Sequence, residues 1–243
     1  VEQHLLGGVV EVVGAADHVG DPHQPVVHHR GEVVGGEPVR AQQDEVLDVA
    51  HGEVDLAADG VVPLPSHLSY AEGATLPCAA LTAWNAIVET GRVKAGDSVL
   101  LLGTGGVSIF ALQFARMMGA RTIITSSSEE KLARARGLGA SVTINYRQKP
   151  DWEAAVLEAT DGKGVDLTVE VGGAGTLPRT IAATRVAGTI ALIGVLTGGQ
   201  IDPALVMRKS IRLQGIYVGS RRMFLDMNRA IAAPAMQPVI DRV

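Results

Sequence analysis

Cysteine, aromatic residues and excess positive charge are all scarce in this sequence. The chain has 243 residues with a single cysteine, Cys78, 3% aromatic residues and a formal net charge of −5. One cysteine excludes an internal disulfide and a zinc site made only of cysteines, and it is typical of a reducing compartment. The negative charge and the lack of a Lys/Arg-rich run argue against binding to nucleic-acid phosphates. We therefore predict no nucleic-acid partner.

Signals for secretion and for membrane insertion are also missing. Residues 1–20 contain acidic residues and histidines where a signal peptide needs a basic and then an apolar stretch. The apolar segment 98–115 is interrupted by Gly103, Gly105 and Gly106, which is typical of a buried strand followed by a helix. The sequence thus predicts a cytoplasmic protein without a membrane partner.

The first segment has an unusual composition. Residues 1–65 use only ten residue types, and all ten have codons that begin with G or C. We hypothesise that most of residues 1–56 is translated from a wrong frame or from the opposite strand, and that this segment is disordered or misfolded. Six of the seven histidines lie there, and His23, His28 and His29 suggest a metal site. No regular scaffold or outer shell supports those ligands, so a solvated tail is the preferred interpretation.

The part of the chain from residue 97 alternates short apolar runs with helical stretches. This alternation is typical of a parallel sheet with crossover helices. The predicted strands are 98–102, 122–125, 141–145, 166–171, 189–193 and 211–216, and the predicted helices are 106–118, one beginning among the serines at 126–128, 152–160, 176–184 and 221–232. Six strands with intervening crossovers predict an α/β fold with a doubly wound parallel Rossmann sheet.

A glycine-rich turn lies between the first predicted strand and its helix. In Gly103-Thr104-Gly105-Gly106-Val107-Ser108, the first glycine permits a tight turn and the second lets the backbone approach a pyrophosphate. The helix that follows offers free N–H groups to an anion. Ser108 replaces the last glycine of the dinucleotide fingerprint. The position of the turn nevertheless favours a dinucleotide site over a plain tight turn.

The end of the second predicted strand bears on the choice between NADH and NADPH. An acidic residue there would bind the ribose 2′-hydroxyl, but this chain has Ser126 and Ser127, with Lys131 about one helical turn away. Hydroxyl groups and a cation suit a 2′-phosphate, so NADPH is preferred over NADH. The alternative is that the serines only cap the helix, whose first turn carries Glu129 and Glu130.

Several motifs from residue 58 onward resemble the medium-chain dehydrogenase/reductases, in particular the quinone-oxidoreductase-like and zinc-type alcohol dehydrogenase-like members. The motifs are Pro63-Leu64-Pro65 with Leu68-Ser69-Tyr70, the run from Ala74 to Trp84, Val93-Lys94-Ala95-Gly96-Asp97, the glycine turn, Gly139-Ala140 before Ile144-Asn145-Tyr146, Gly164-Val165-Asp166, Val169-Glu170-Val171-Gly172-Gly173, and Gly188-Thr189. The resemblance implies a linker with a first helix at 57–96 and an NAD(P)-binding Rossmann domain at 97–243. It also implies a preceding barrel-like catalytic domain, in whose place stands the segment 1–56.

The resemblance implies hydride transfer between NAD(P)H and a carbonyl, alcohol or quinone substrate. Carried over residue by residue, it places Ser127, Lys131 and Tyr146 near the 2′-phosphate. The residues along the nicotinamide side would be Val171, Gly172, Gly173, Ile193 and Gly194. Thr82 resembles a residue that lines the nicotinamide pocket, and helix packing is an equally good account of it. No residue is identified as the proton donor.

Three further expectations concern metal, partner and completeness. Cys78 stands where zinc-dependent members place one ligand, but a catalytic zinc needs three protein ligands, so a buried small hydrophobe is the preferred account and zinc is not expected. Relatives form homodimers through the edge of the Rossmann sheet, which here would be strand 211–216. A non-catalytic dinucleotide-binding fragment is the alternative function, and a His-rich metal-binding module ranks last.

Overall fold

A single parallel sheet organises the part of the chain that the computed structural model describes, residues 61–195 and 197–240. The described residues from Val62 to Ile240 belong to one compact unit. The segment 1–56 with its histidines lies outside the described residues, as do residues 57–60 of the linker. The hypotheses about that segment therefore stay predictions.

Within the described ranges the sheet has six strands. Their bounds are Ser98–Leu101 for β1, Arg121–Ser126 for β2, Val142–Asn145 for β3, Val165–Glu170 for β4, Thr184–Leu192 for β5 and Arg212–Gly215 for β6. The order is β3-β2-β1-β4-β5-β6, and every neighbouring pair is parallel. The doubly wound Rossmann sheet predicted from the sequence is thereby confirmed.

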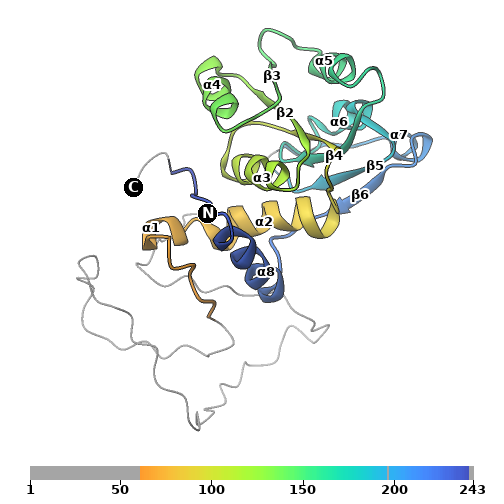
Figure 1. Ribbon diagram of the computed structural model, residues 1–243. Coiled ribbons are helices and arrows are strands. Elements are labelled where there is room, and N and C mark those ends of the chain that lie inside the picture. Colours follow the sequence, from red (N-terminus) through yellow and green to blue (C-terminus); the bar gives the residue numbers. More distant parts are fainter. Residues whose placement is uncertain (1–60, 196, 241–243) are drawn as a thin grey trace, which may run out of the picture. The chain divides into compact units, whose positions relative to one another are not determined.

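Helices cover both faces of this sheet (Figure 1). Their bounds are Gly106–Met117 for α3, Glu129–Gly137 for α4, Trp152–Ala159 for α5, Leu177–Ala183 for α6, Pro203–Arg208 for α7 and Arg221–Ala232 for α8. Helix α3 packs on β1 and β2, whereas α6 packs on β4 and β5 and also contacts α5 and α7. Among the helices described, none has the length and apolar character needed to cross a membrane.

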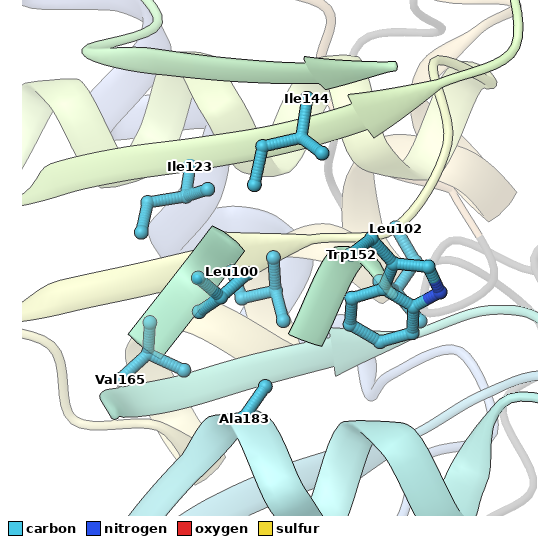
Figure 2. Close-up of a cluster of buried hydrophobic side chains, with 8 residues drawn as sticks. Leu100, Leu102, Ile123, Ile144, Trp152, Val165 and Ala183 are labelled. Atoms are coloured by element: carbon cyan, nitrogen blue, oxygen red, sulfur yellow. The ribbon is translucent and has the colours of Figure 1, made fainter. Parts of the chain in front are cut away.

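The core between the sheet and helix α5 is built from strand residues of one face (Figure 2). Strands β1 to β4 direct apolar side chains toward Trp152 and Val156 of α5, which are both buried. The strand residues are Leu100, Ile123, Ile144 and Val165. Leu102, which follows β1, and Ala183, at the end of α6, complete the cluster. Because parallel strands are covered on both faces, such short apolar runs identify them in the sequence. This core fixes the strand ends that carry the site.

A helical segment precedes the sheet. It consists of α1 (Tyr70–Gly73), α2 (Leu81–Trp84) and two π-helical turns, Leu76–Ala80 and Asn85–Thr90. Helix α2 packs against α3 and α8. Trp84 contacts Phe114 of α3 edge to face, with 5.4 Å between ring centroids. These contacts bury the segment that the sequence resemblance places in the inter-domain region.

Two elements differ from the sequence prediction by more than one or two residues at an end. Strand β5 begins at Thr184, five residues before the predicted strand 189–193, because an irregularity with Ala187 at φ +56° interrupts its apolar pattern. Helix α7 was not predicted. Its signal was present, since Asp202 accepts a hydrogen bond from the backbone N–H of Ala204 (2.9 Å) and Pro203 occupies the first turn.

An ion pair joins three strands at the amino-terminal edge of the sheet. The carboxylate of Asp166 accepts hydrogen bonds from the backbone N–H and hydroxyl of Ser98, both at 2.8 Å, and from Nε of Arg185 at 2.6 Å. Partial burial raises the pKa of Asp166, but these hydrogen bonds outweigh burial and hold that pKa below its usual value. The pair ties β1, β4 and β5 together at the edge opposite the site.

Candidate functional site

The switch in strand order lies between β1 and β4, which are neighbours at the centre of the sheet. From this point the chain continues to β2 on one side and to β5 on the other, so the loops after β1 and β4 diverge. Ligands of open α/β sheets bind in the crevice at the carboxyl ends of such strands. The glycine turn after β1 and the Gly172-Gly173 turn after β4 both lie at this place.

The glycine turn after β1 leaves the first turn of α3 without a side-chain cap. Gly103 has φ +72° and donates its N–H to Oγ1 of Thr125 at 3.1 Å. Gly105 is the N-cap of α3 and provides no side-chain acceptor, whereas Ser128 and Ser220 cap α4 and α8. A Cβ atom at Gly103 or Gly105 would meet nothing within 4 Å. The turn therefore exposes helix N–H groups beside open space, as anion-binding turns do.

The last three residues of the predicted phosphate turn, Gly106, Val107 and Ser108, lie inside helix α3. Ser108 is buried, and its hydroxyl donates to the backbone carbonyl of Leu102 at 2.7 Å. A Cβ at Gly106 would lie 3.4 Å from Cβ of Ala79. Ser108 thus closes the strand-to-helix turn with its side chain, in the position where the fingerprint has a glycine for close packing. Val107 is half-buried in the first turn.

Polar side chains gather at the carboxyl end of β2. Ser126 is buried, and its hydroxyl lies 3.1 Å from Oγ1 of Thr104 in the glycine turn. Ser128 caps α4 by accepting from the backbone N–H of Lys131 at 3.3 Å. Ser127 is half-buried, and the side chains of Lys131 and Tyr146 are exposed. Of the serines considered for the 2′-phosphate, Ser126 is therefore occupied internally and Ser127 remains open to a ligand.

The loops after β4 and β5 are joined to each other. The backbone N–H groups of Ile193 and Gly194 donate to the carbonyl of Glu170 at 2.8 and 2.9 Å. The hydroxyl of Thr197 donates to the carbonyl of Gly172 at 2.9 Å. A Cβ at Gly194 would lie 2.4 Å from the carbonyl carbon of Val171. The two loops consequently form one wall at the carboxyl end of the sheet.

A cleft of about 540 Å³ opens next to this wall. It lies between the ends of β1, β2 and β4 and the loop that precedes α5. Its lining residues are Leu102, Gly103, Thr125, Tyr146, Pro150, Trp152, Val171, Gly172, Thr176 and Arg179. Aromatic and aliphatic side chains dominate the lining, which suits a flat heterocycle. A second cavity of about 520 Å³ lies beside β3, away from the glycine turn, and its Asn145 and Glu129 side chains bond each other.

The helical segment contains Thr82 and Cys78, the two residues that the family resemblance singled out there. The hydroxyl of Thr82 is buried and donates to the carbonyl of Cys78 at 2.7 Å, so it is satisfied within its own segment. Cys78 is exposed, and the expectation of a buried small hydrophobe was wrong. The reason is that Leu76 and Ala80 form the buried face of this turn.

A zinc ion at Cys78 would need further ligands from the protein. A catalytic zinc takes three protein ligands. In the described part of the chain, no three His, Cys, Asp or Glu side chains come together in a way that could hold a metal ion. Cys78 therefore has no companion ligands among these residues, and they do not by themselves fit a zinc site.

Four polar residues shape the site through contacts that sequence reasoning did not predict. Thr125 of β2 accepts the hydrogen bond from the N–H of Gly103, and Thr104 of the glycine turn bonds Ser126 at the end of β2. Glu170 and Thr176 lie at the end of β4 and the start of α6 and bond each other at 2.7 Å. Glu170 left a signal in the sequence, because a carboxyl group at the end of an apolar strand needs partners when it is buried.

Comparison with known proteins agrees with this geometry. A family model described as "Zinc-binding dehydrogenase" matches residues 106–233. A zinc-type alcohol dehydrogenase-like protein of Schizosaccharomyces pombe is 45% identical over 196 residues, which are 77% of this chain and 57% of that protein. The structure of a putative alcohol dehydrogenase from Sinorhizobium meliloti superimposes with a TM-score of 0.71 at 44% identity, covering 74% of this chain and 53% of that one. The chain thus spans little more than half the length of these two proteins.

A further relative aligns with almost the whole sequence. The zinc-type alcohol dehydrogenase-like protein YogA of Leptosphaeria maculans is 34% identical over 244 residues, covering 98% of this chain and 67% of that protein. The alignment reaches into residues 1–56, further than the resemblance found from residue 58. The chain belongs to the zinc-binding dehydrogenase family, within the medium-chain dehydrogenase/reductases.

Proposed function

We propose that this chain binds NADPH and carries the cofactor-binding part of an oxidoreductase that transfers hydride to or from a carbonyl, alcohol or quinone substrate. The uncapped glycine turn at the start of α3 is the observation that carries this proposal. Open space beside Gly103 and Gly105 gives a pyrophosphate room to approach the helix N–H groups. Membership of a dehydrogenase family supports the same ligand.

The site residues fall into three groups, and each group would contact one part of the cofactor. The N–H groups of Gly105, Gly106 and Val107 would hold the pyrophosphate, and the cleft beside Trp152 would take the adenine ring. The wall formed by Val171, Gly172, Gly173, Ile193 and Gly194 would align the nicotinamide, and two of its residues, Val171 and Gly172, also line that cleft. When bound, the cofactor supplies the hydride, while the protein orients it and excludes water.

The preference for NADPH over NADH rests on Ser127, Lys131 and Tyr146 at the end of β2. Positions 126, 127 and 128 are serines and not Asp or Glu, so no carboxylate at these three positions repels a 2′-phosphate. The exposed ammonium group of Lys131 lies in the first turn of α4, where helix N–H groups also favour an anion. Glu129 bonds Asn145 at 2.6 Å and is thereby held by the neighbouring strand.

Substituting Lys131→Ala tests this preference. We expect the Kd for NADPH to rise by about tenfold and the Kd for NADH to stay within about twofold, because one charge-assisted contact to the phosphate is lost. Fluorescence titration of both nucleotides measures the effect. Lys163→Ala is the matched control, since Lys163 is an exposed lysine before β4, at the opposite edge of the sheet. Equal weakening of NADPH and NADH would contradict a role for Lys131 in choosing between them.

The proposed function itself is tested by titration followed by turnover on one sample. We expect the full chain to raise NADPH fluorescence with saturation, and then to oxidise NADPH in the presence of a quinone or an aldehyde. Binding without turnover would favour the alternative, a non-catalytic dinucleotide-binding fragment, which the partial coverage of the relatives supports. Absence of binding would refute both.

We propose further that two copies associate through strand β6. This strand is an edge of the sheet, and Arg212, Gln214 and Gly215 are exposed on it. An unpaired edge offers a row of N–H and C=O groups to a second chain. A symmetric pair of β6 strands would extend the sheet from six strands to twice that number.

A further inference from the structure

Arg179 is the one charged residue among the described residues that line the cleft beside Trp152. It belongs to helix α6, and its side chain is 45% exposed, so the guanidinium group lies at the rim of the cleft and not at its base. The other lining residues are apolar, aromatic or uncharged. The rim of this cleft therefore carries a single cation next to a space that suits a flat heterocycle.

One nitrogen of this guanidinium group is held by the chain at the start of α5. Nη1 of Arg179 donates a hydrogen bond to the backbone carbonyl of Pro150 and lies 3.8 Å from Oε2 of Glu153. The Glu153 side chain is 22% exposed, and the pair is an ion pair without a hydrogen bond. Arg179 thus connects α6 with the loop before α5, and both of these elements line the cleft.

The rest of the guanidinium group is available to a ligand. Within residues 61–195 and 197–240, neither Nε nor Nη2 of Arg179 makes a hydrogen bond or an ion pair. The flat face of a guanidinium group stacks on aromatic rings and on nucleobases. Because Pro150 already fixes one end of the side chain, ordering it against a ligand costs less side-chain entropy. Glu153 offsets part of its charge, which favours a neutral ring over a phosphate as the partner.

We propose that Arg179 binds the adenine ring of the cofactor by stacking its guanidinium group against the ring from the rim of the cleft. This inference rests on the proposed function, which assigns the adenine ring to the same cleft. The phosphates have other partners in that assignment, namely the glycine turn for the pyrophosphate and Lys131 for the 2′-phosphate. Val171 and the ring of Trp152 supply apolar surface to the same pocket.

Arg179→Ala tests the proposal. We expect the Kd values for NADPH, NADH and AMP each to rise about fivefold, since a contact between a cation and a ring changes affinity by about two- to thirtyfold. The ratio of the Kd values for NADPH and NADH should stay within about twofold, in contrast to the result expected for Lys131→Ala. The Kd for reduced nicotinamide mononucleotide, which has no adenine ring, should also stay within about twofold. All four ligands are titrated against the full chain by calorimetry.

Two more variants separate ligand binding from packing. Arg185→Ala is the matched control, because Arg185 also connects two elements through an ion pair, to Asp166, and its side chain is 43% exposed, but it lies at the opposite edge of the sheet. Its loss should lower the Tm without changing any of the four Kd values. Arg179→Lys keeps the charge and removes the flat face, so it should still bind AMP about threefold more weakly than the parent.

The outcomes separate this inference from the function on which it rests. Weaker binding of all three adenine nucleotides in Arg179→Ala, with reduced nicotinamide mononucleotide unaffected, supports it. Four results overturn it while leaving dinucleotide binding intact: unchanged Kd values, an equal loss for reduced nicotinamide mononucleotide, the same losses in Arg185→Ala, or a loss confined to NADPH, which would place the guanidinium group at the 2′-phosphate. Parent-like affinity in Arg179→Lys overturns the stacking contact. If the unsubstituted chain binds neither NADPH nor AMP, the proposed function fails and the inference falls with it.

Discussion

Replacing Gly105 with Asp should lower the affinity for NADPH by at least about a hundredfold while leaving the fold intact. The backbone at Gly105 has φ −80° and ψ 177°, which any residue adopts, and a Cβ there meets nothing within 4 Å. The new carboxylate would stand where the pyrophosphate is expected. Two like charges about 5 Å apart repel by about 3 kcal/mol at an effective dielectric constant of about 20, which exceeds a hundredfold in Kd.

The same substitution should slightly stabilise the protein without cofactor. Asp is a better N-cap than Gly by a few tenths of a kcal/mol, and a negative charge at the N-terminus of α3 interacts favourably with the helix dipole. Thermal unfolding of the cofactor-free chain should therefore show a Tm equal to or slightly above that of the parent. Opposite signs for stability and for binding distinguish a lost ligand site from a damaged fold.

Gly105→Asn is the matched control for the charge. Asn has nearly the same shape and also caps a helix, so its effect on NADPH is limited to steric crowding, about tenfold or less. If Asp and Asn weaken NADPH equally, charge repulsion is not the cause. If neither changes the affinity, the pyrophosphate does not bind at this turn and the proposed function loses its main support.

The second large effect is expected from Gly194→Ala, which should destabilise the protein by about 3 kcal/mol and also impair NADPH binding. The added Cβ would lie 2.4 Å from the carbonyl carbon of Val171, 2.5 Å from the nitrogen of Gly173 and 2.6 Å from that of Gly172. These are backbone atoms, so no side-chain rotation relieves the clash and the two loops must move apart. For a chain of this size the Tm should fall by about 6–12 °C.

Gly198→Ala provides the control for Gly194→Ala within the same loop. A Cβ at Gly198 meets nothing within 4 Å, and its φ is not in the left-handed region. Its Tm and its Kd for NADPH should therefore match those of the parent within experimental scatter. A Gly194→Ala protein as stable as the control would show that the loops after β4 and β5 are not in the close contact described.

Together these substitutions dissect the wall and the turn separately. Gly105→Asp acts on the pyrophosphate turn through charge, whereas Gly194→Ala acts on the nicotinamide wall through the backbone. A chain that behaves as expected in both cases has a pyrophosphate turn and a wall that act as proposed, whatever its hydride acceptor is.

Local patterns were enough to predict the elements of the fold. Most strands of the sheet contain a short apolar run, and the glycine turn lies between one such run and a helix, so neighbours in sequence carry the information. Helix α8 was predicted with the bounds observed, Arg221–Ala232, and Ser220 caps its start. Strand β5 was predicted too short because its irregularity at Ala187 follows from pairing with β4, which no local pattern encodes.

Burial and pairing at the site were decided only by the tertiary structure. The sequence by itself indicated the succession of strands and helices along the chain, apart from α7, and the glycine turn, because these depend on residue spacing. Its motifs also resembled the family that the comparisons then showed. The structure decided that Cys78 is exposed, that Thr125 supports Gly103 and that Glu170 is enclosed by four donors. Each depends on groups brought together by the packing of separate elements, since the partners of a buried polar group are chosen by the fold and not by its neighbours in sequence.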